Sequence, residues 1–223
     1  MRPWFLFIYI ALLVITVISA IDPGLTQLHN WSKPSLMISL FACIALNWKQ
    51  GKARLYVPLI LAVTFSLIGD ILLLPELGST YFVAGLLSFL CAHICYIVLF
   101  LKVPHRPLEV PFIRRNPWLI FLAIVFGIWM FTKIKSGAGD IAWAVLIYTL
   151  VILTMFLAAF NREGAVGKKS FVLVALGAFL FTISDSILAW NKFNEPVVMA
   201  STIILSTYGL AQLMIVRGVL LQE

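Results

Sequence analysis

Apolar runs of 16 to 21 residues recur along the whole chain, separated by loops too short to form a second domain. About 20 apolar residues in an α-helix cross the ~30 Å hydrocarbon core of a bilayer. Only 11% of the residues are charged, against about 25% in a soluble domain. We therefore predict an all-α helical membrane bundle, a single transmembrane domain over residues 1–223. The eight predicted spans are residues 4–21, 33–48, 56–74, 81–101, 118–133, 140–160, 171–190 and 197–217.

Lysine and arginine divide unevenly between the two sides of these spans. Twelve fall on the side that holds both termini: Arg2, Lys49, Lys52, Arg54, Lys102, Arg106, Arg114, Arg115, Arg162, Lys168, Lys169 and Arg217. The other side has four: Lys33, Lys133, Lys135 and Lys192. The positive-inside rule then predicts a multi-pass protein of the cell membrane, inner or plasma, with cytoplasmic N and C termini. Because the basic residues lie between spans and not along one helix face, we expect no nucleic-acid partner.

A short motif occurs in both halves of the chain. The segment GDILL at residues 69–73 matches SDSIL at residues 184–188, and each has a phenylalanine upstream. Both spans run in the same direction in the predicted topology, which favours two parallel repeats related by an axis along the membrane normal. The predicted repeats are residues 1–104 and 105–223. They would place Asp70 and Asp185 at equivalent depths on facing helices.

Asp70 and Asp185 each lie about five residues from the end of a span, roughly 6–8 Å inside it. A carboxylate there costs at least about 2.5–3.5 kcal/mol, so it should face the bundle interior and mark a function. Two carboxyls in one buried site would repel each other, leaving one protonated and the other ionised. A general acid and base pair needs this arrangement. The alternative is structural, with each aspartate accepting hydrogen bonds or pairing with a lysine that reaches in from the interface.

Other polar residues inside the spans are candidate substrate-binding groups. His93 shares a helix face with Gly85 and Tyr96, and the glycine would allow a close helix approach. Tyr208 follows Asp185 by 23 residues, as His93 follows Asp70. Such groups line a cavity or hold helices together, and a lysine at a span end can also extend to the interface or meet a lipid phosphate. The candidates from this pattern are Lys33, Ser66, His93, Tyr96, Ser184, Tyr208 and Gln212.

The ordered set of motifs resembles the YhhN family of multi-pass membrane proteins, which includes lysoplasmalogenases. The matching pieces of the first half are Lys33-Pro34, Phe65-Ser66, Gly69-Asp70, Leu73, Phe82, Gly85, Phe89, His93 and Tyr96. Those of the second half are Tyr148, Gly177-Ala178-Phe179, Phe181, Ser184-Asp185, Leu188-Ala189, Phe193, Thr207-Tyr208, Ala211-Gln212 and Leu213. The resemblance covers nearly the whole chain and adds Tyr148 to the candidate substrate-binding residues.

The resemblance implies hydrolysis of the vinyl-ether bond of a lysoplasmalogen, which gives a fatty aldehyde and glycerophosphoethanolamine or glycerophosphocholine. The partners would be a lysophospholipid substrate and membrane lipids. Asp70 and Asp185 would be the catalytic acid and base. We expect no metal and no organic cofactor, and no disulfide among Cys43, Cys91 and Cys95. Two other classes stay open: a proton-coupled transporter and a non-catalytic membrane component.

Overall fold

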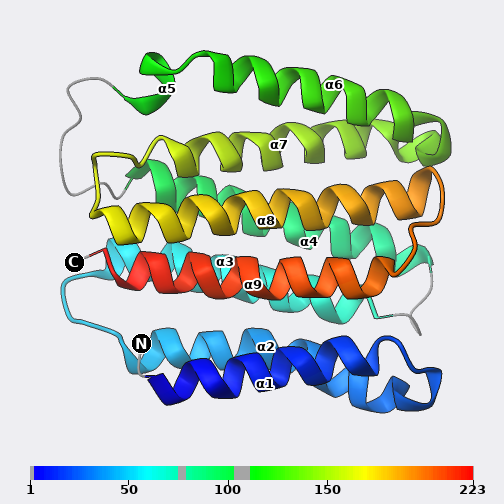
Figure 1. Cartoon of the computed structure of the whole chain (residues 1–223), viewed down its shortest axis with the longest axis horizontal. Helices are drawn as coiled ribbons and strands as arrows, with labels where there is room; N and C mark the ends of the chain where they lie inside the picture. Colours follow the sequence, from blue (N-terminus) through cyan, green and yellow to red (C-terminus); the bar gives the residue numbers. More distant parts are fainter. Residues whose placement is uncertain (1–2, 75–78, 103–110, 223) are drawn as a thin grey trace. The chain divides into compact units, whose positions relative to one another are not determined.

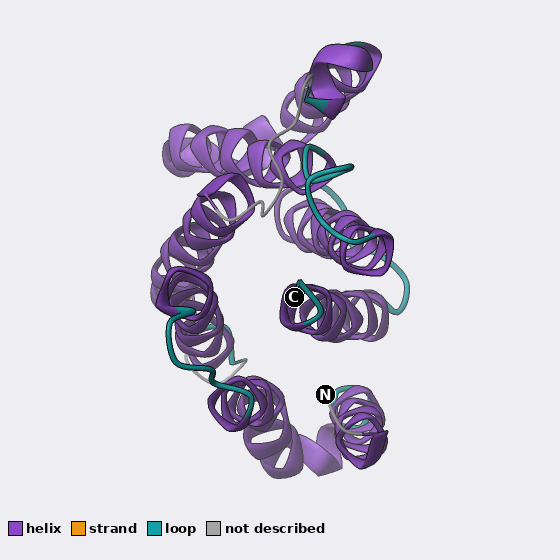
Figure 2. Ribbon diagram, turned by 90° about the vertical axis from the view of Figure 1, so that its left-hand side faces the viewer, coloured by secondary structure: helices purple, strands orange, loops and turns teal. Residues whose placement is uncertain are grey.

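The computed structural model describes residues 3–74, 79–102 and 111–222, which form helices joined by short loops (Figure 1). The long helices are α1 (Pro3–Ser19), α2 (Thr26–Leu46), α3 (Ala53–Leu72), α4 (Ser79–Lys102), α6 (Trp118–Ala138), α7 (Ala142–Phe160), α8 (Lys168–Phe193) and α9 (Ala200–Leu220). The shorter elements are α5 (Phe112–Arg115) and the 3-10 turns η1 (Pro23–Leu25) and η3 (Gly139–Ile141). Figure 2 shows helices and loops but no strand in these described ranges. The predicted all-α fold class is confirmed.

Five helical stretches in the described part of the chain are long and apolar enough to cross a membrane: Ala53–Leu72, Tyr81–Lys102, Trp118–Phe160, Lys168–Phe193 and Ala200–Leu220. The 43-residue stretch Trp118–Phe160 contains two helices, α6 and α7. The chain turns between them at Gly139, where φ is +51°. The chain is therefore a multi-pass membrane protein. Its cellular membrane and the side of its termini stay predictions, and Arg2 and Arg106, used for that orientation, lie outside the described residues.

Some predicted span boundaries were wrong. The second span was predicted to begin at Lys33, but α2 begins at Thr26 and contains Pro34 in its interior. Its first turns are polar, so hydropathy alone misses them. The fifth span was predicted to end at residue 133, whereas α6 continues through Lys135 to Ala138. Helix geometry tolerates polar residues beyond the apolar stretch, and hydropathy detects only that stretch.

The chain divides into two compact units, Met1–Leu99 and Phe100–Glu223, which are described separately below. In the first unit, α1 packs on α2 and α2 packs on α3. In the second unit, α6 packs against α7 and α8, while the contact between α8 and α9 is the most extensive of the chain's described helix pairs. Consecutive long helices run antiparallel within each unit (Figure 1). The predicted parallel repeats over residues 1–104 and 105–223 stay a prediction.

Two glycines allow the close contact between α8 and α9. A Cβ atom added to Gly177 would lie 2.9 Å from the carbonyl oxygen of Ala211, and one added to Gly218 would lie 3.0 Å from the carbonyl oxygen of Ser170. Small residues bring helix backbones together in this way inside membranes, where no hydrophobic force between helices assists. This close backbone packing fixes the register of α9 against α8, and with it the positions of the polar residues on both helices.

We expect Gly177→Ala to destabilise the protein by about 1–3 kcal/mol, because the added methyl group would overlap backbone atoms that cannot move aside. Gly167→Ala is the matched control, since a Cβ atom there would meet nothing within 4 Å. Thermal unfolding in detergent measures the difference. Equal unfolding midpoints for the two variants would contradict the close-packing account.

Candidate functional site

Asp70 is the buried carboxylate of the first unit. It lies in the last turn of α3, and only 1% of its surface is exposed. The preceding residue, Gly69, allows the ring of Phe89 on α4 to pack against α3, because an added Cβ atom would lie 2.6 Å from that ring. Gly85 of α4 similarly lies against Leu73, which confirms the predicted close helix approach. Tight packing of α3 on α4 therefore fixes the Asp70 backbone.

Lys33 brings a positive charge to Asp70. Its side chain is only 8% exposed on α2, and Nζ donates to the carbonyl oxygen of Leu73 at 3.4 Å. That carbonyl lies at the C-terminal end of α3, where a cation is favoured by the helix dipole. Lys33 also lies close enough to Asp70 for the two charges to interact. Lys33 thus extends into the unit and not outward to the interface, and a buried counter-charge explains how α3 tolerates a carboxylate.

Tyr9 of α1 is a further member of this cluster, and the sequence interpretation missed it. It is fully buried and interacts electrostatically with Asp70 and with Tyr96 of α4. Tyr9 lies on the buried face of α1 that also contains Phe5, Leu13 and Thr16. A tyrosine in an apolar run resembles an ordinary membrane residue, so its role depends on knowing which face is buried.

The structure brings together side chains from four helices of the first unit: Tyr9, Lys33, Asp70 and Tyr96. The predicted candidates Ser66 and His93 are also fully buried in this unit, and both make interactions within the chain. Buried polar side chains in lipid need internal partners, so this cluster is a polar centre inside an apolar bundle.

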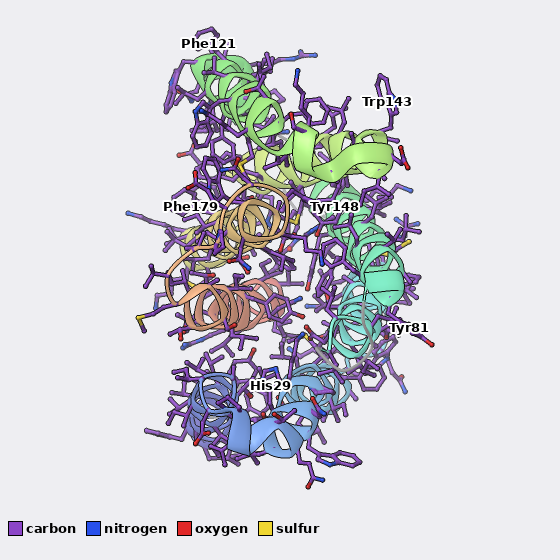
Figure 3. All side chains as sticks on the ribbon, turned by 90° about the vertical axis from the view of Figure 1, so that its right-hand side faces the viewer. His29, Tyr81, Phe121, Trp143, Tyr148 and Phe179 are labelled. Carbon is purple, nitrogen blue, oxygen red and sulfur yellow. The ribbon has the colours of Figure 1, made fainter. Side chains whose placement is uncertain are left out.

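Asp185 is the carboxylate of the second unit. It lies on α8, is partly exposed, and accepts a short hydrogen bond at Oδ2 from the hydroxyl of Tyr148 on α7. Figure 3 shows Tyr148 and Phe179 on opposite sides of α8, so the carboxylate contact and the Phe179 side chain belong to different faces of this unit. A hydroxyl that donates to a carboxylate stabilises its negative charge and fixes its orientation.

Two other candidates of the second unit, Ser184 and Tyr208, lie at the contact between α8 and α9, and a third, Gln212, lies on α9. Ser184 Oγ donates to the carbonyl oxygen of Ile204 at 3.0 Å, which joins the two helices. Tyr208 packs edge-on against Phe181, with ring centroids 5.4 Å apart. Gln212 is fully buried. For Ser184 the structure shows a helix-joining contact, one of the two roles expected for such groups.

The two carboxylates have partners at the same sequence spacing. Lys33 precedes Asp70 by 37 residues, and Tyr148 precedes Asp185 by 37 residues. In each unit the partner lies on the second long helix and the aspartate on the third. The partner chemistry differs, however, since one is an ammonium and the other a phenol. Because the aspartates belong to different units, their predicted pairing in one site stays a prediction.

The described residues contain no group of three or more His, Cys, Asp or Glu side chains that could hold a metal ion. Cys43, Cys91 and Cys95 are free thiols. Asp70 and Asp185 lie in helical stretches long and apolar enough to cross a membrane, and each interacts with a side chain that bears a proton. These features define a helical membrane protein with polar centres inside its bundle.

The chain belongs to the YhhN family, whose family model matches residues 28–219. It is 28% identical over 159 residues to lysoplasmalogenase TMEM86B of Homo sapiens, covering 71% of this chain and 62% of that protein. The protein of the same name from Sus scrofa is 31% identical over 156 residues, covering 69% and 59%. Lysoplasmalogenase TMEM86A of Bos taurus is 30% identical over 165 residues, covering 73% and 63%.

The matched region thus spans about three fifths of the length of these relatives. No solved structure matches the chain.

Proposed function

We propose that this protein hydrolyses the vinyl-ether bond of lysoplasmalogens, releasing a fatty aldehyde and glycerophosphoethanolamine or glycerophosphocholine. The observation that carries the proposal is a carboxylate in each unit that interacts with a side chain bearing a proton: Lys33 through its charge for Asp70, and Tyr148 through a hydrogen bond for Asp185. The relatives named lysoplasmalogenases support the same reaction class.

The reaction needs an acid and a base. Cleavage of an enol ether begins when a proton is added to the β-carbon, which leaves an oxocarbenium ion at the carbon attached to oxygen. Water attacks that carbon and loses a proton, and the resulting hemiacetal breaks down to aldehyde and alcohol. A carboxylic acid can donate the first proton, while a carboxylate stabilises the cation and accepts the proton of the attacking water. Paired carboxylates perform these tasks at glycosidic bonds. In this proposal Asp70 and Asp185 are the two groups.

The neighbouring residues prepare these carboxylates. Lys33 balances the charge of Asp70 in a nearly water-free setting, where an uncompensated charge would be costly. Tyr148 orients the Asp185 carboxylate. Ser66, His93, Tyr96, Tyr208, Ser184 and Gln212 are proposed to line the region that receives the lipid. A substrate of this kind partitions into a bilayer, so a multi-pass protein in the cell membrane, with cytoplasmic termini, is a suitable catalyst.

The direct test measures aldehyde release from lysoplasmenyl-ethanolamine by the purified protein in detergent. A lysolipid with a saturated ether bond is the control, since its carbon chain cannot accept a proton. Release from the vinyl ether alone supports the proposal. If neither lipid yields product, while vesicles containing the protein take up protons together with a solute, the protein is a proton-coupled transporter.

We expect Tyr148→Phe to lower kcat for aldehyde release by about 10- to 100-fold, the equivalent of one hydrogen bond to a charged group. Tyr56→Phe is a matched control, because the Tyr56 hydroxyl is also buried and donates to a backbone oxygen, that of Asn47 at 2.8 Å. Steady-state kinetics of both variants give the comparison. A Tyr148→Phe enzyme as active as the control would remove Tyr148 from the site.

A further inference from the structure

Asp70 and Asp185 lie at the same distance along their helices. Asp70 follows Ala53, the first residue of α3, by 17 positions, and Asp185 follows Lys168, the first residue of α8, by 17 positions. At 1.5 Å per residue, each carboxylate is about 26 Å from the start of its helix. Asp70 is two residues from the end of α3, and Asp185 is eight residues from the end of α8. Both carboxylates therefore lie in the C-terminal half of a helix.

In each unit, the partner of the carboxylate lies toward the same helix ends as the carboxylate. Lys33 Nζ donates to the carbonyl oxygen of Leu73, the residue that caps the C-terminal end of α3. Tyr148, which donates to Asp185, is the seventh residue of α7, and α7 runs antiparallel to α8 (Figure 1). The polar centre of each unit thus lies toward the end at which α3 or α8 finishes.

The chain crosses the membrane three times between α3 and α8, through α4, α6 and α7, which all lie in stretches long and apolar enough to span. Since consecutive spans alternate in direction, α3 and α8 run the same way, and α9 returns the chain to the side where α8 began. Both carboxylates then lie near the side opposite the C terminus. Lysine and arginine are more numerous on the C-terminal side, which the positive-inside rule assigns to the cytoplasm.

The bond that the proposed reaction cleaves lies close to the polar head of the lipid. The vinyl-ether oxygen is attached to glycerol, so the two carbons of the double bond are the first carbons of the chain. A lipid in the leaflet opposite the C terminus places these carbons just below its head group, on the side where the carboxylates lie. A lipid in the other leaflet would have to carry its phosphate through most of the ~30 Å hydrocarbon core, where a charged group is costly.

We propose that the protein takes its lysoplasmalogen from the non-cytoplasmic leaflet and releases the glycerophospho head group on that side of the membrane. The inference rests on the proposed function. The lipid enters from the side at which α3 and α8 end, and its head group stays at the surface while the vinyl ether reaches the carboxylates. Asp185, which is partly exposed, is the carboxylate that such a lipid meets first, whereas Asp70 is only 1% exposed.

The test uses two cysteine variants that mark opposite ends of α8. Lys168 begins this helix and Glu195 follows its last residue, and both are exposed. The native cysteines lie within α2 and α4, so the unchanged protein gives the labelling background. Lys168→Cys and Glu195→Cys are each reconstituted at a low protein-to-lipid ratio in sealed phosphatidylcholine vesicles. A membrane-impermeant biotin maleimide, added outside, allows vesicles with the marked end outward to be collected.

Lysoplasmenyl-choline is then added outside the collected vesicles, and the glycerophosphocholine that appears outside is measured. We expect Glu195→Cys vesicles to form it at least about tenfold faster than Lys168→Cys vesicles, because in the latter the charged head group must first cross the membrane. Detergent removes that barrier and should make the two rates equal. A faster reaction in intact Lys168→Cys vesicles, or equal rates in the two intact preparations, would overturn the proposed side of reaction.

Labelling in spheroplasts of a bacterial host that produces the protein tests which side is cytoplasmic. The impermeant maleimide should label Glu195→Cys and leave Lys168→Cys unlabelled. The reverse pattern would put the reaction in the cytoplasmic leaflet and contradict the proposal. An unchanged protein that releases no aldehyde even in detergent would contradict the proposed function itself, so the two failures are distinguishable.

Discussion

Asp70→Asn and Asp185→Asn are each expected to lower kcat for aldehyde release by about 10²- to 10⁴-fold, the usual contribution of a general acid or base. Asparagine has nearly the same size as aspartate but can neither donate a carboxyl proton nor carry the negative charge. In the first unit the substitution would also leave Lys33 without its counter-charge. In the second unit the amide would replace the acceptor of the Tyr148 hydrogen bond. Steady-state assays with lysoplasmenyl-ethanolamine give the rates.

The chain provides its own controls for these substitutions. It has two other aspartates, Asp22 and Asp140, and both are exposed in short turns between helices. Asp22→Asn and Asp140→Asn should leave kcat unchanged. Thermal unfolding of all four variants separates lost chemistry from lost structure. If Asp70→Asn or Asp185→Asn folds normally and retains full activity, that carboxylate has no catalytic role.

Arg162→Ala is expected to lower the free energy of unfolding by about 2–5 kcal/mol, as deletion of a large buried side chain does. Arg162 follows α7 and is only 1% exposed. Its Nη2 donates to Ser170 Oγ at 3.1 Å and to Gln222 Oε1 at 2.8 Å. Ser170 in turn donates to the carbonyl oxygen of Gly218 at 2.7 Å. One guanidinium thus joins the end of α7, the start of α8 and the end of α9.

The positive charge of Arg162 is not the main source of the stability that its side chain provides. Burial lowers the pKa of Arg162 to about 10, so the side chain is still a cation at neutral pH. Its Nε and Nη1 atoms have no hydrogen-bond partner among the described residues, although the group lies over the ring of Phe100. Arg162→Met keeps most of the volume and removes the buried charge, so it should retain much more stability than Arg162→Ala. Equal free energies of unfolding for Arg162→Ala and the unchanged protein would contradict this account.

The helical fold could be predicted from the sequence because lipid leaves few alternatives. Every backbone polar group in hydrocarbon must find a partner within the protein, so long apolar runs become helices. The start of α2 could not be predicted in the same way. Its first turns contain His29 and Ser32, which are buried against α1 despite their polarity. Partners from another helix decide such boundaries, and hydropathy along one segment does not contain that information.

The candidate site, like the fold, could be predicted from the sequence only in part. Asp70 and Asp185 could be selected from the sequence because a carboxylate inside an apolar span is costly. Their partners depend on helix packing. Tyr148 was suggested only by the family resemblance, Tyr9 was missed, and Lys33 was expected to extend to the interface as readily as inward. The two partners of Asp70, Tyr9 and Lys33, come from different helices of one unit, so spacing along a single helix could not identify them.

The most direct test of the central claim is hydrolysis of lysoplasmenyl-ethanolamine by the purified protein in D₂O, with the aldehyde trapped early and analysed by mass spectrometry. If a carboxyl group protonates the vinyl-ether carbon, the aldehyde contains one deuterium on the carbon next to the carbonyl, and Asp70→Asn and Asp185→Asn form almost none of it. Aldehyde without deuterium, or no aldehyde from any vinyl-ether lysolipid, would contradict the account.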